Sequence, residues 1–171
     1  MQHVISTTST RQKRRVIAVA VVAAIAALAS VAAQAGECPA DKVVPEGKGQ
    51  PMSAAEPAKA VTDKVITSTE LAKEPVAIQG RLFRARLLEI GAGGVVPWHA
   101  HGDRPALILI SSGEITEYAS TCAVPIQHKA GDITAEKNPT SHWWKNHGTT
   151  PVIIYSFDIF RSEDKKNEKM M

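Results

Sequence analysis

The chain has 171 residues, with 20 Lys and Arg against 17 Asp and Glu, and a formal net charge of +3. Four of the basic residues lie within the first 15 positions, so residues 36–171 carry 16 basic (20 − 4) and 17 acidic side chains, a net charge of −1. This balance excludes a strongly basic nucleic-acid-binding protein, and a mature chain of 136 residues (171 − 35) is the size of one domain.

The first 35 residues have the pattern of an export signal. A basic stretch, residues 11–15, precedes the apolar run 16–33, and Ala33-Gln34-Ala35 forms a small-x-small cleavage site. Together these features predict a signal peptide, residues 1–35, that is cleaved after Ala35, and hence a periplasmic or secreted protein. The alternative is an uncleaved apolar segment that anchors the protein to the inner membrane.

Residues 36–63 are rich in Pro, Gly, Lys, Ala and Glu and show no sustained apolar period. We therefore expect an N-terminal arm or linker with at most a short strand or turn. Cys38 lies in this arm and Cys122 lies in the body that follows. In an oxidising compartment a disulfide between them would tie the arm to the body, and two separate thiols are the alternative.

Residues 64–160 carry β signals, whereas residues 161–171 have the composition of a solvated charged tail. No stretch of this body has a helical period, and Gly and Pro separate the extended runs. The GAGG sequence at 91–94 is expected to be a turn. This pattern predicts an all-β sandwich or barrel. The expected strands cover residues 64–69, 81–90, 95–101, 105–110, 113–120 and 151–160, with short extended pieces in 130–148.

Alternation within residues 81–90 places Arg84 and Arg86 on the same face as Leu82, Leu88 and Ile90. If this face is turned inward, the two arginines would bind an anionic substrate. If it is turned outward, they are solvated, which is the commoner arrangement for arginine.

Two histidines in the stretch PWHAHGDRP, residues 97–105, are the clearest candidates for metal ligands. His99 and His101 are separated by one residue on a predicted strand, so both imidazoles lie on one face and can reach one ion. His142 follows 41 residues after His101, with Asn146 four residues further on. Three neutral imidazoles on adjacent strands would leave coordination positions open for water or substrate.

Three further side chains are candidates for the wall of a pocket. Trp144 has the parity of His142 and Asn146, whereas Trp143 faces the other way. Trp144 and Asn146 are therefore assigned to the pocket, and plain core packing is the alternative for the tryptophan. Tyr155, on the last expected strand, is assigned to the pocket for its hydroxyl group.

The sequence resembles a small single-domain cupin over roughly residues 78–160. The first cupin motif consists of a glycine, five residues, H-x-H, three or four residues, a glutamate, six residues and a glycine. The second consists of a glycine, five residues, P-x-G-x-x-H, three residues and an asparagine. Matching residues are Gly93, His99, His101 and Gly113 for the first motif, and Gly131, His142 and Asn146 for the second, with Lys137 and Pro139 at its proline and second-glycine positions.

One position of the first motif is not matched. Pro105 and Ala106 stand where the motif's glutamate, a metal ligand in many cupins, would fall. The resemblance therefore carries over three histidine ligands and not the fourth. Asp103 is the nearest carboxylate, and we expect it to cap the turn or to pair with Arg104 rather than to reach the ion.

The resemblance implies a single jelly-roll β-barrel, a homodimer and a divalent transition metal, with Fe(II) first and Zn, Ni, Mn or Cu as alternatives. It implies a dioxygenase-like oxidoreductase that acts on a small organic molecule at the three-histidine site. The alternative is a non-catalytic cupin that holds a small ligand or a metal. An isomerase of the sugar-modifying cupin type would need an acid–base pair to which the sequence does not point.

Overall fold

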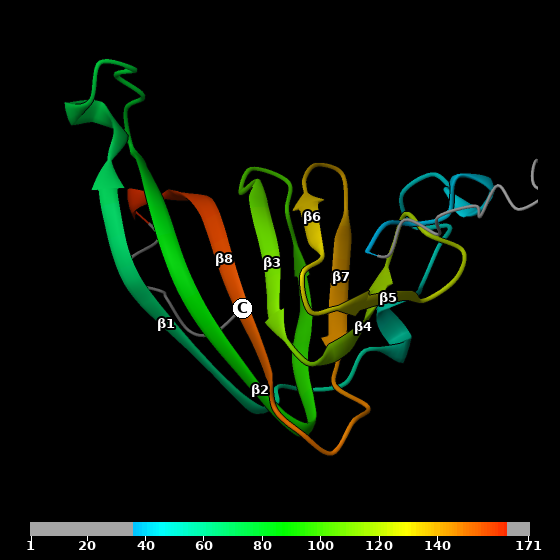
Figure 1. Cartoon of the computed structure of the whole chain (residues 1–171). Coiled ribbons are helices and arrows are strands. Elements are labelled where there is room, and N and C mark those ends of the chain that lie inside the picture. Colours follow the sequence, from blue (N-terminus) through cyan, green and yellow to red (C-terminus); the bar gives the residue numbers. More distant parts are fainter. Residues whose placement is uncertain (1–35, 164–171) are drawn as a thin grey trace, which may run out of the picture. The chain divides into compact units, whose positions relative to one another are not determined.

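The computed structural model describes residues 36–163, which are all β apart from short 3₁₀ turns (Figure 1). By backbone contacts the chain divides into two units, Met1–Ala33 and Gln34–Met171. The predicted signal peptide, residues 1–35, and the last eight positions of the predicted charged tail, 164–171, lie outside the described residues. Within 36–163, no helix has the length and apolar character needed to cross a bilayer.

Eight antiparallel strands make up the described part of the chain. They are β1 (Lys59–Glu70), β2 (Arg81–Ala100), β3 (Ala106–Ser112), β4 (Glu114–Ala119), β5 (Ile126–Lys129), β6 (Ile133–Glu136), β7 (Ser141–Lys145) and β8 (Val152–Arg161). The 3₁₀ turns are η1 (Ala40–Lys42), η2 (Met52–Ala54) and η3 (Leu71–Lys73).

The long strand β2 joins two halves of the sheet. Its residues 81–90 pair with β1 and β8, and β8 continues to β3 and β6. Its residues 95–100 pair with β7, which continues to β4 and β5. After β2, the first half therefore contains β3, β6 and β8, and the second half contains β4, β5 and β7. The chain passes between the two halves several times. This exchange between two antiparallel layers is the jelly-roll arrangement, so the predicted all-β jelly roll is confirmed.

The glycine run at 91–94 bends β2 instead of ending it, so the predicted turn is wrong. The strand changes partner there, from β8 at Ile90 to β7 at Val95. Gly93 has a φ of +64°, a left-handed conformation that favours glycine. A Cβ on Gly94 would lie 2.7 Å from the carbonyl oxygen of Gly91. The glycines thus let one continuous strand belong to both halves.

The N-terminal arm is shorter than predicted, because β1 begins at Lys59 rather than at residue 64. Residues 59–63 were assigned to the arm, yet they pair with β2. Backbone hydrogen bonds attach the rest of the arm to the segment after β4, including one from Val44 N–H to the Thr121 carbonyl at 2.9 Å. Cys38 and Cys122 form a disulfide, as the first of the two alternatives for this pair expects.

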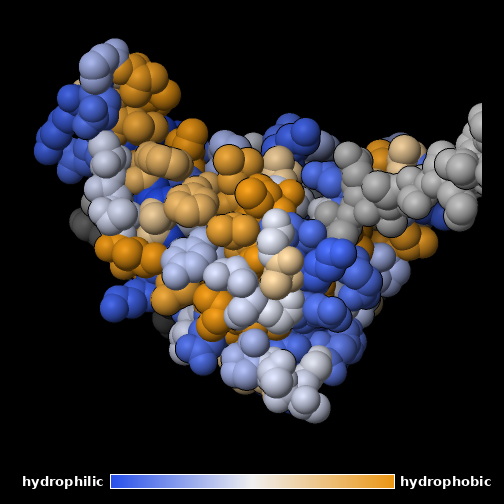
Figure 2. All heavy atoms as spheres, viewed as in Figure 1, coloured by the Kyte–Doolittle hydropathy of each residue, from blue (hydrophilic) through white to orange (hydrophobic). Residues whose placement is uncertain are grey.

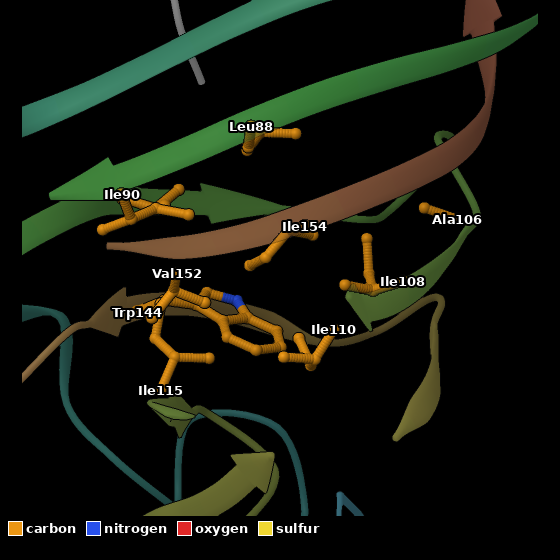
Figure 3. Packing of buried hydrophobic residues seen from close by; sticks show 10 residues of the cluster. Leu88, Ile90, Ala106, Ile108, Ile110, Ile115, Trp144, Val152 and Ile154 are labelled. Carbon is orange, nitrogen blue, oxygen red and sulfur yellow. The ribbon is translucent and has the colours of Figure 1, made fainter. Parts of the chain in front are cut away.

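The apolar core lies between the two halves of the sheet (Figure 3). Strands β2, β3 and β8 supply branched aliphatic side chains from one half, and β4 and β7 supply Ile115 and Trp144 from the other. The fully buried members include Ile90, Ile110, Ile115 and Val152. Packing of both halves against one core holds the strands that carry the histidines at a fixed separation.

Apolar side chains also gather on the outer face of the first half, over β8 and β3 (Figure 2). Phe83, Leu107 and Ile133 are about half exposed or more on this face. The predicted homodimer remains a prediction.

Candidate metal centre

Three imidazoles from neighbouring segments meet at one end of the core. His99 lies on β2, His101 follows directly after the last residue of that strand, and His142 lies opposite His99 on β7. Their ring centroids are 5.0 Å apart for His99 and His101, 4.5 Å for His99 and His142, and 4.8 Å for His101 and His142. The i, i+2 spacing on β2 and the antiparallel register with β7 thus bring together the residues of both sequence motifs.

Each imidazole uses its Nδ1 atom in a hydrogen bond to the protein. With the proton on Nδ1, each ring donates to an oxygen. The Nε2 atom is then unprotonated and can serve as the metal ligand. The acceptors are the Pro97 carbonyl for His99 at 2.9 Å, the Arg104 carbonyl for His101 at 2.9 Å and the Glu117 carboxylate for His142 at 2.6 Å.

The three histidines offer ring nitrogens close enough to share one transition-metal ion. One ligand atom from each histidine can be chosen so that all lie within 4.8 Å of one another. The Nε2 atoms of His99 and His142 are 3.1 Å apart. The Nε2 atom of His101 is buried and has no hydrogen-bond partner among residues 36–163. A metal ion satisfies such an atom, and fixed Nδ1 hydrogen bonds are the usual support of metal-binding histidines.

A buried carboxylate pair lies behind His142. Glu117 on β4 accepts hydrogen bonds from His142 and, at 2.9 Å, from the Nε2 atom of His128. One carboxylate oxygen of Glu136 on β6 is 3.4 Å from the same Nδ1 atom of His142. Both carboxylates face Nδ1 and not Nε2, so they lie behind the ligand, where they orient it and increase its basicity.

The metal-free site keeps two of its imidazoles neutral. Burial, followed by the charge of His142, lowers the pKa of His101 to about 3. Burial, then His142 and His101, lowers the pKa of His99 well below its usual value. Burial also opposes charge on His142, but Glu136 and Glu117 outweigh it and raise the pKa of His142. Without a metal, His99 and His101 therefore stay neutral, whereas the two carboxylates favour the protonated form of His142.

The two carboxylates behind His142 differ in protonation. Burial raises the pKa of Glu136 to about 7, and the negative charge of Glu117 adds to this effect. Burial acts in the same direction on Glu117, but His142 and His128 overcome it and lower its pKa to about 2. Glu117 is thus the ionised partner of His142.

A small cavity of about 30 Å³ opens beside the three imidazoles. This volume holds an ion with a few water-sized groups and is far below that of a drug-sized pocket. Its walls combine apolar side chains with imidazole and guanidinium groups. The lining residues are Arg86, Leu88, Val96, His99, His101, Arg104, Ile108, His142, Trp144, Ile154 and Ser156.

Of the three residues assigned to the pocket, only Trp144 is among those that line the cavity. Trp144 lines the cavity, and its Nε1 atom lies 3.4 Å from Nε2 of His142. Asn146 does not line it, because its amide is used to hold the turn after β7 and donates to the carbonyls of Ile90, Gly91 and Thr150 at 2.8–3.0 Å. Tyr155 does not line it either, because it alternates with the buried residues of β8, and Ser156 takes the inward position.

The structure decides between the alternatives for Arg84, Arg86 and Asp103. Arg84 and Arg86 face inward, at 3% and 7% exposure, because their strand face packs against the other half of the sheet. Both guanidinium groups bind Asp158, which is buried on β8. Asp103 is not part of the histidine cluster, as expected, but it pairs with Arg81 and Arg161 and not with Arg104, because its carboxylate is at the surface.

Sequence reasoning missed Glu117, Glu136 and Arg104. Glu117 shares its strand face with the buried Ile115 and Ala119, and this parity was the available signal. For Glu136 the alternation misleads, because β6 exposes Ile133 and buries the carboxylate.

No protein-family model matches the chain, and no curated protein matches it. Similar solved structures include the cupin domain of Schizosaccharomyces pombe Cnp3, with a TM-score of 0.48 and 16% identity over 67% of this chain and 71% of that one. KdgF from Halomonas sp. has a TM-score of 0.47 and 14% identity over 64% and 88%. An uncharacterised Klebsiella pneumoniae protein with a double-stranded β-helix domain has a TM-score of 0.47 and 18% identity over 64% and 85%.

The fold assignment depends on the strand order of this chain and on the meeting of its two histidine motifs. β2 passes through both halves of the sheet, and His99 lies opposite His142 in its pairing with β7. On these two observations, the chain has the cupin-type jelly-roll fold.

Proposed function

We propose that this protein is a metal-dependent, dioxygenase-like oxidoreductase that acts on a small organic molecule. The observation that supports this is that His99, His101 and His142 each offer one ring nitrogen within 4.8 Å of the other two, beside a cavity. Fe(II) is the first candidate for the ion, because three imidazoles on one side leave positions for oxygen and substrate. The bound metal would supply Lewis-acid and redox chemistry, which no side chain of the cavity offers.

The chain's own residues would position the ligand and keep water out. Leu88, Val96, Ile108 and Ile154 form the apolar part of the cavity wall. This wall favours a small molecule with an apolar body, and it lowers the local dielectric around the ligand atoms. Glu117 holds His142 with its Nδ1 atom protonated, so that Nε2 is kept as the metal ligand.

Export to the periplasm or beyond the cell is part of the proposal. The disulfide between Cys38 and Cys122 supports an oxidising compartment. The apolar segment 16–33 and the cleavage pattern at 33–35 are the sequence evidence for the route.

A non-catalytic metal- or ligand-binding protein is the second candidate. The small volume of the cavity, about 30 Å³, favours it, because little space remains for a substrate once an ion is bound.

Oxygen consumption separates the two candidates. Purified full-length protein is depleted of metal, reloaded with Fe(II), and supplied with a panel of small organic molecules in an oxygen electrode. Uptake by wild type that is lost in His99→Ala supports the oxygenase. His147→Ala is the matched control, since His147 is an exposed histidine bonded to Tyr118 at 2.9 Å. Full iron loading without uptake for any compound would favour the binding protein.

A further inference from the structure

Arg104 is a buried cation at the wall of the cavity that the proposed metal chemistry does not use. The residue is 6% exposed and lines the same cavity as the three imidazoles. Its Nη1 atom is buried and has no hydrogen-bond partner among the described residues. A buried guanidinium nitrogen without a partner is costly, so this atom is a docking point for a hydrogen-bond acceptor.

The nearest carboxylate is already occupied by two other arginines. Asp158 binds Arg84 through two hydrogen bonds, at 2.9 and 2.7 Å, and lies 3.3 Å from Arg86. Its Oδ2 atom is 3.9 Å from Nη1 of Arg104, beyond hydrogen-bond distance.

The charges around the cavity indicate that the hydrogen-bond acceptor at Arg104 is an anion. The three imidazoles bring no negative charge to the cavity, and the position of the motif glutamate is taken by Pro105 or Ala106. A divalent ion at the histidines would therefore place further positive charge in the cavity that already contains Arg104. An anion between the two cations would remove this repulsion.

The size and the walls of the cavity indicate the class of anion. A guanidinium group matches a carboxylate, which it can bind through two parallel hydrogen bonds. The volume of about 30 Å³ accepts only a few heavy atoms. Leu88, Ile108 and Ile154 would contact an aliphatic portion.

We propose that the cavity binds a small aliphatic carboxylate, with its oxygens at Arg104 beside the metal held by the three histidines. The part of this inference that concerns the metal rests on the proposed function. Arg104 is a specificity-determining residue in this account: it selects anionic over neutral ligands of equal size.

The test uses cobalt as a spectroscopic probe and acetate as the ligand. Metal-depleted full-length protein is titrated with Co(II), and the visible absorption is followed as acetate is added. Acetate changes the spectrum of the wild type, whereas acetamide, its neutral isostere, does not. Arg104→Gln weakens acetate binding by about tenfold to a hundredfold, as expected for the loss of a charged hydrogen bond. Arg104→Lys, which keeps the charge, weakens it less.

Arg161→Gln is the matched control, because Arg161 is an exposed arginine that is bonded to Asp103 and is not among the residues that line the cavity. It binds acetate as the wild type does. Equal acetate affinity in wild type and Arg104→Gln, or equal binding of acetate and acetamide, would overturn the inference while leaving the metal site intact.

If the three histidines do not bind a metal, the protein shows no cobalt absorption before any acetate is added. The carboxylate site is then tested in metal-free protein by thermal unfolding. Acetate raises the midpoint of the wild type and leaves that of Arg104→Gln unchanged. If Arg104→Gln does not fold, Arg104→Lys and the acetamide comparison decide the question, and an unchanged midpoint of the wild type with acetate contradicts the inference.

Discussion

At the scale of single residues, the nitrogen that each imidazole offers to a metal is set by what its other nitrogen binds. Two of the Nδ1 acceptors are backbone carbonyls within three residues of the histidine, those of Pro97 and Arg104. The third acceptor is the side chain of Glu117, which comes from a different strand. His142 is therefore the ligand whose orientation depends most on a distant part of the sequence.

This dependence can be tested at Glu117. Glu117→Gln keeps the size of the side chain but removes the charge that supports His142, so metal affinity should fall by about tenfold to a hundredfold. Competition with a chelator measures the affinity. Glu114→Gln, an exposed glutamate on the same strand, should leave it unchanged. A loss of equal size in both variants would contradict the assigned role of Glu117.

The low pKa of His101 predicts how metal-free protein responds to acid. In the unfolded chain a histidine has a pKa of about 6.5, against about 3 for His101 in the fold. Between these values the unfolded state binds the additional proton. The contribution of His101 to stability is thus complete above pH 6.5 and is lost as the pH falls toward 3, by up to about 1.4 kcal/mol per pH unit.

Urea unfolding of chelator-treated protein between pH 4 and 7 measures this effect. His101→Gln lacks the titrating group, so its free energy of unfolding should fall less steeply than that of the wild type. Identical pH profiles would show that His101 is not held neutral by the fold.

At the scale of secondary structure, strand parity predicted more than the positions of turns. Alternation correctly placed His99 with His101, and Arg84 with the buried Leu88. It could not show which face of β2 is inward, since two arginines on a face usually indicate solvent. The buried Asp158, 74 residues from Arg84, reverses that rule, and only the tertiary pairing of β2 with β8 reveals it.

The bend in β2 was not predictable for a related reason. Glycines permit both a chain reversal and a bent strand, and the choice depends on whether partner strands continue on both sides. Here β8 and β7 provide these partners, so β2 continues through Gly91 and Gly94 to His99.

A substitution at the bend tests its role. A Cβ at residue 94 would lie 2.7 Å from the Gly91 carbonyl oxygen and 3.0 Å from that of Ala60. Because backbone must move to relieve these contacts, Gly94→Ala should lower the free energy of unfolding by roughly 1–3 kcal/mol. Gly102→Ala is the control, since its nearest neighbour would be the Asn138 side chain at 4.0 Å. Equal unfolding midpoints for the two variants would contradict this account of the bend.

At the scale of the described domain, the disulfide closes a long loop between the arm and the β4–β5 region. Cys38 and Cys122 are 84 residues apart in sequence. In the chain-entropy model, closing a loop of this length stabilises the fold by about 4 kcal/mol. Reduction should lower the urea midpoint of the wild type accordingly. The double variant Cys38→Ser/Cys122→Ser should start from the lower value and not respond to reductant. A wild type that is insensitive to complete reduction would show that the arm contributes little.

The domain also shows how much of the site the sequence contains. Two motifs spaced 41 residues apart, from His101 to His142, were sufficient to predict that the three histidines meet. The carboxylates and the guanidinium around them could not be predicted from spacing, because they come from strands β4 and β6 and from the turn before β3. Their roles exist only once both halves of the sheet have closed on the core.

The central claim is that His99, His101 and His142 bind one transition-metal ion. The direct test is the metal content of full-length protein after metal loading and gel filtration, measured by mass spectrometry of the metal. The account predicts about one ion per chain for wild type and for the control His147→Ala, and almost none for His142→Ala. Equal metal content in wild type and in a folded His142→Ala variant would contradict it.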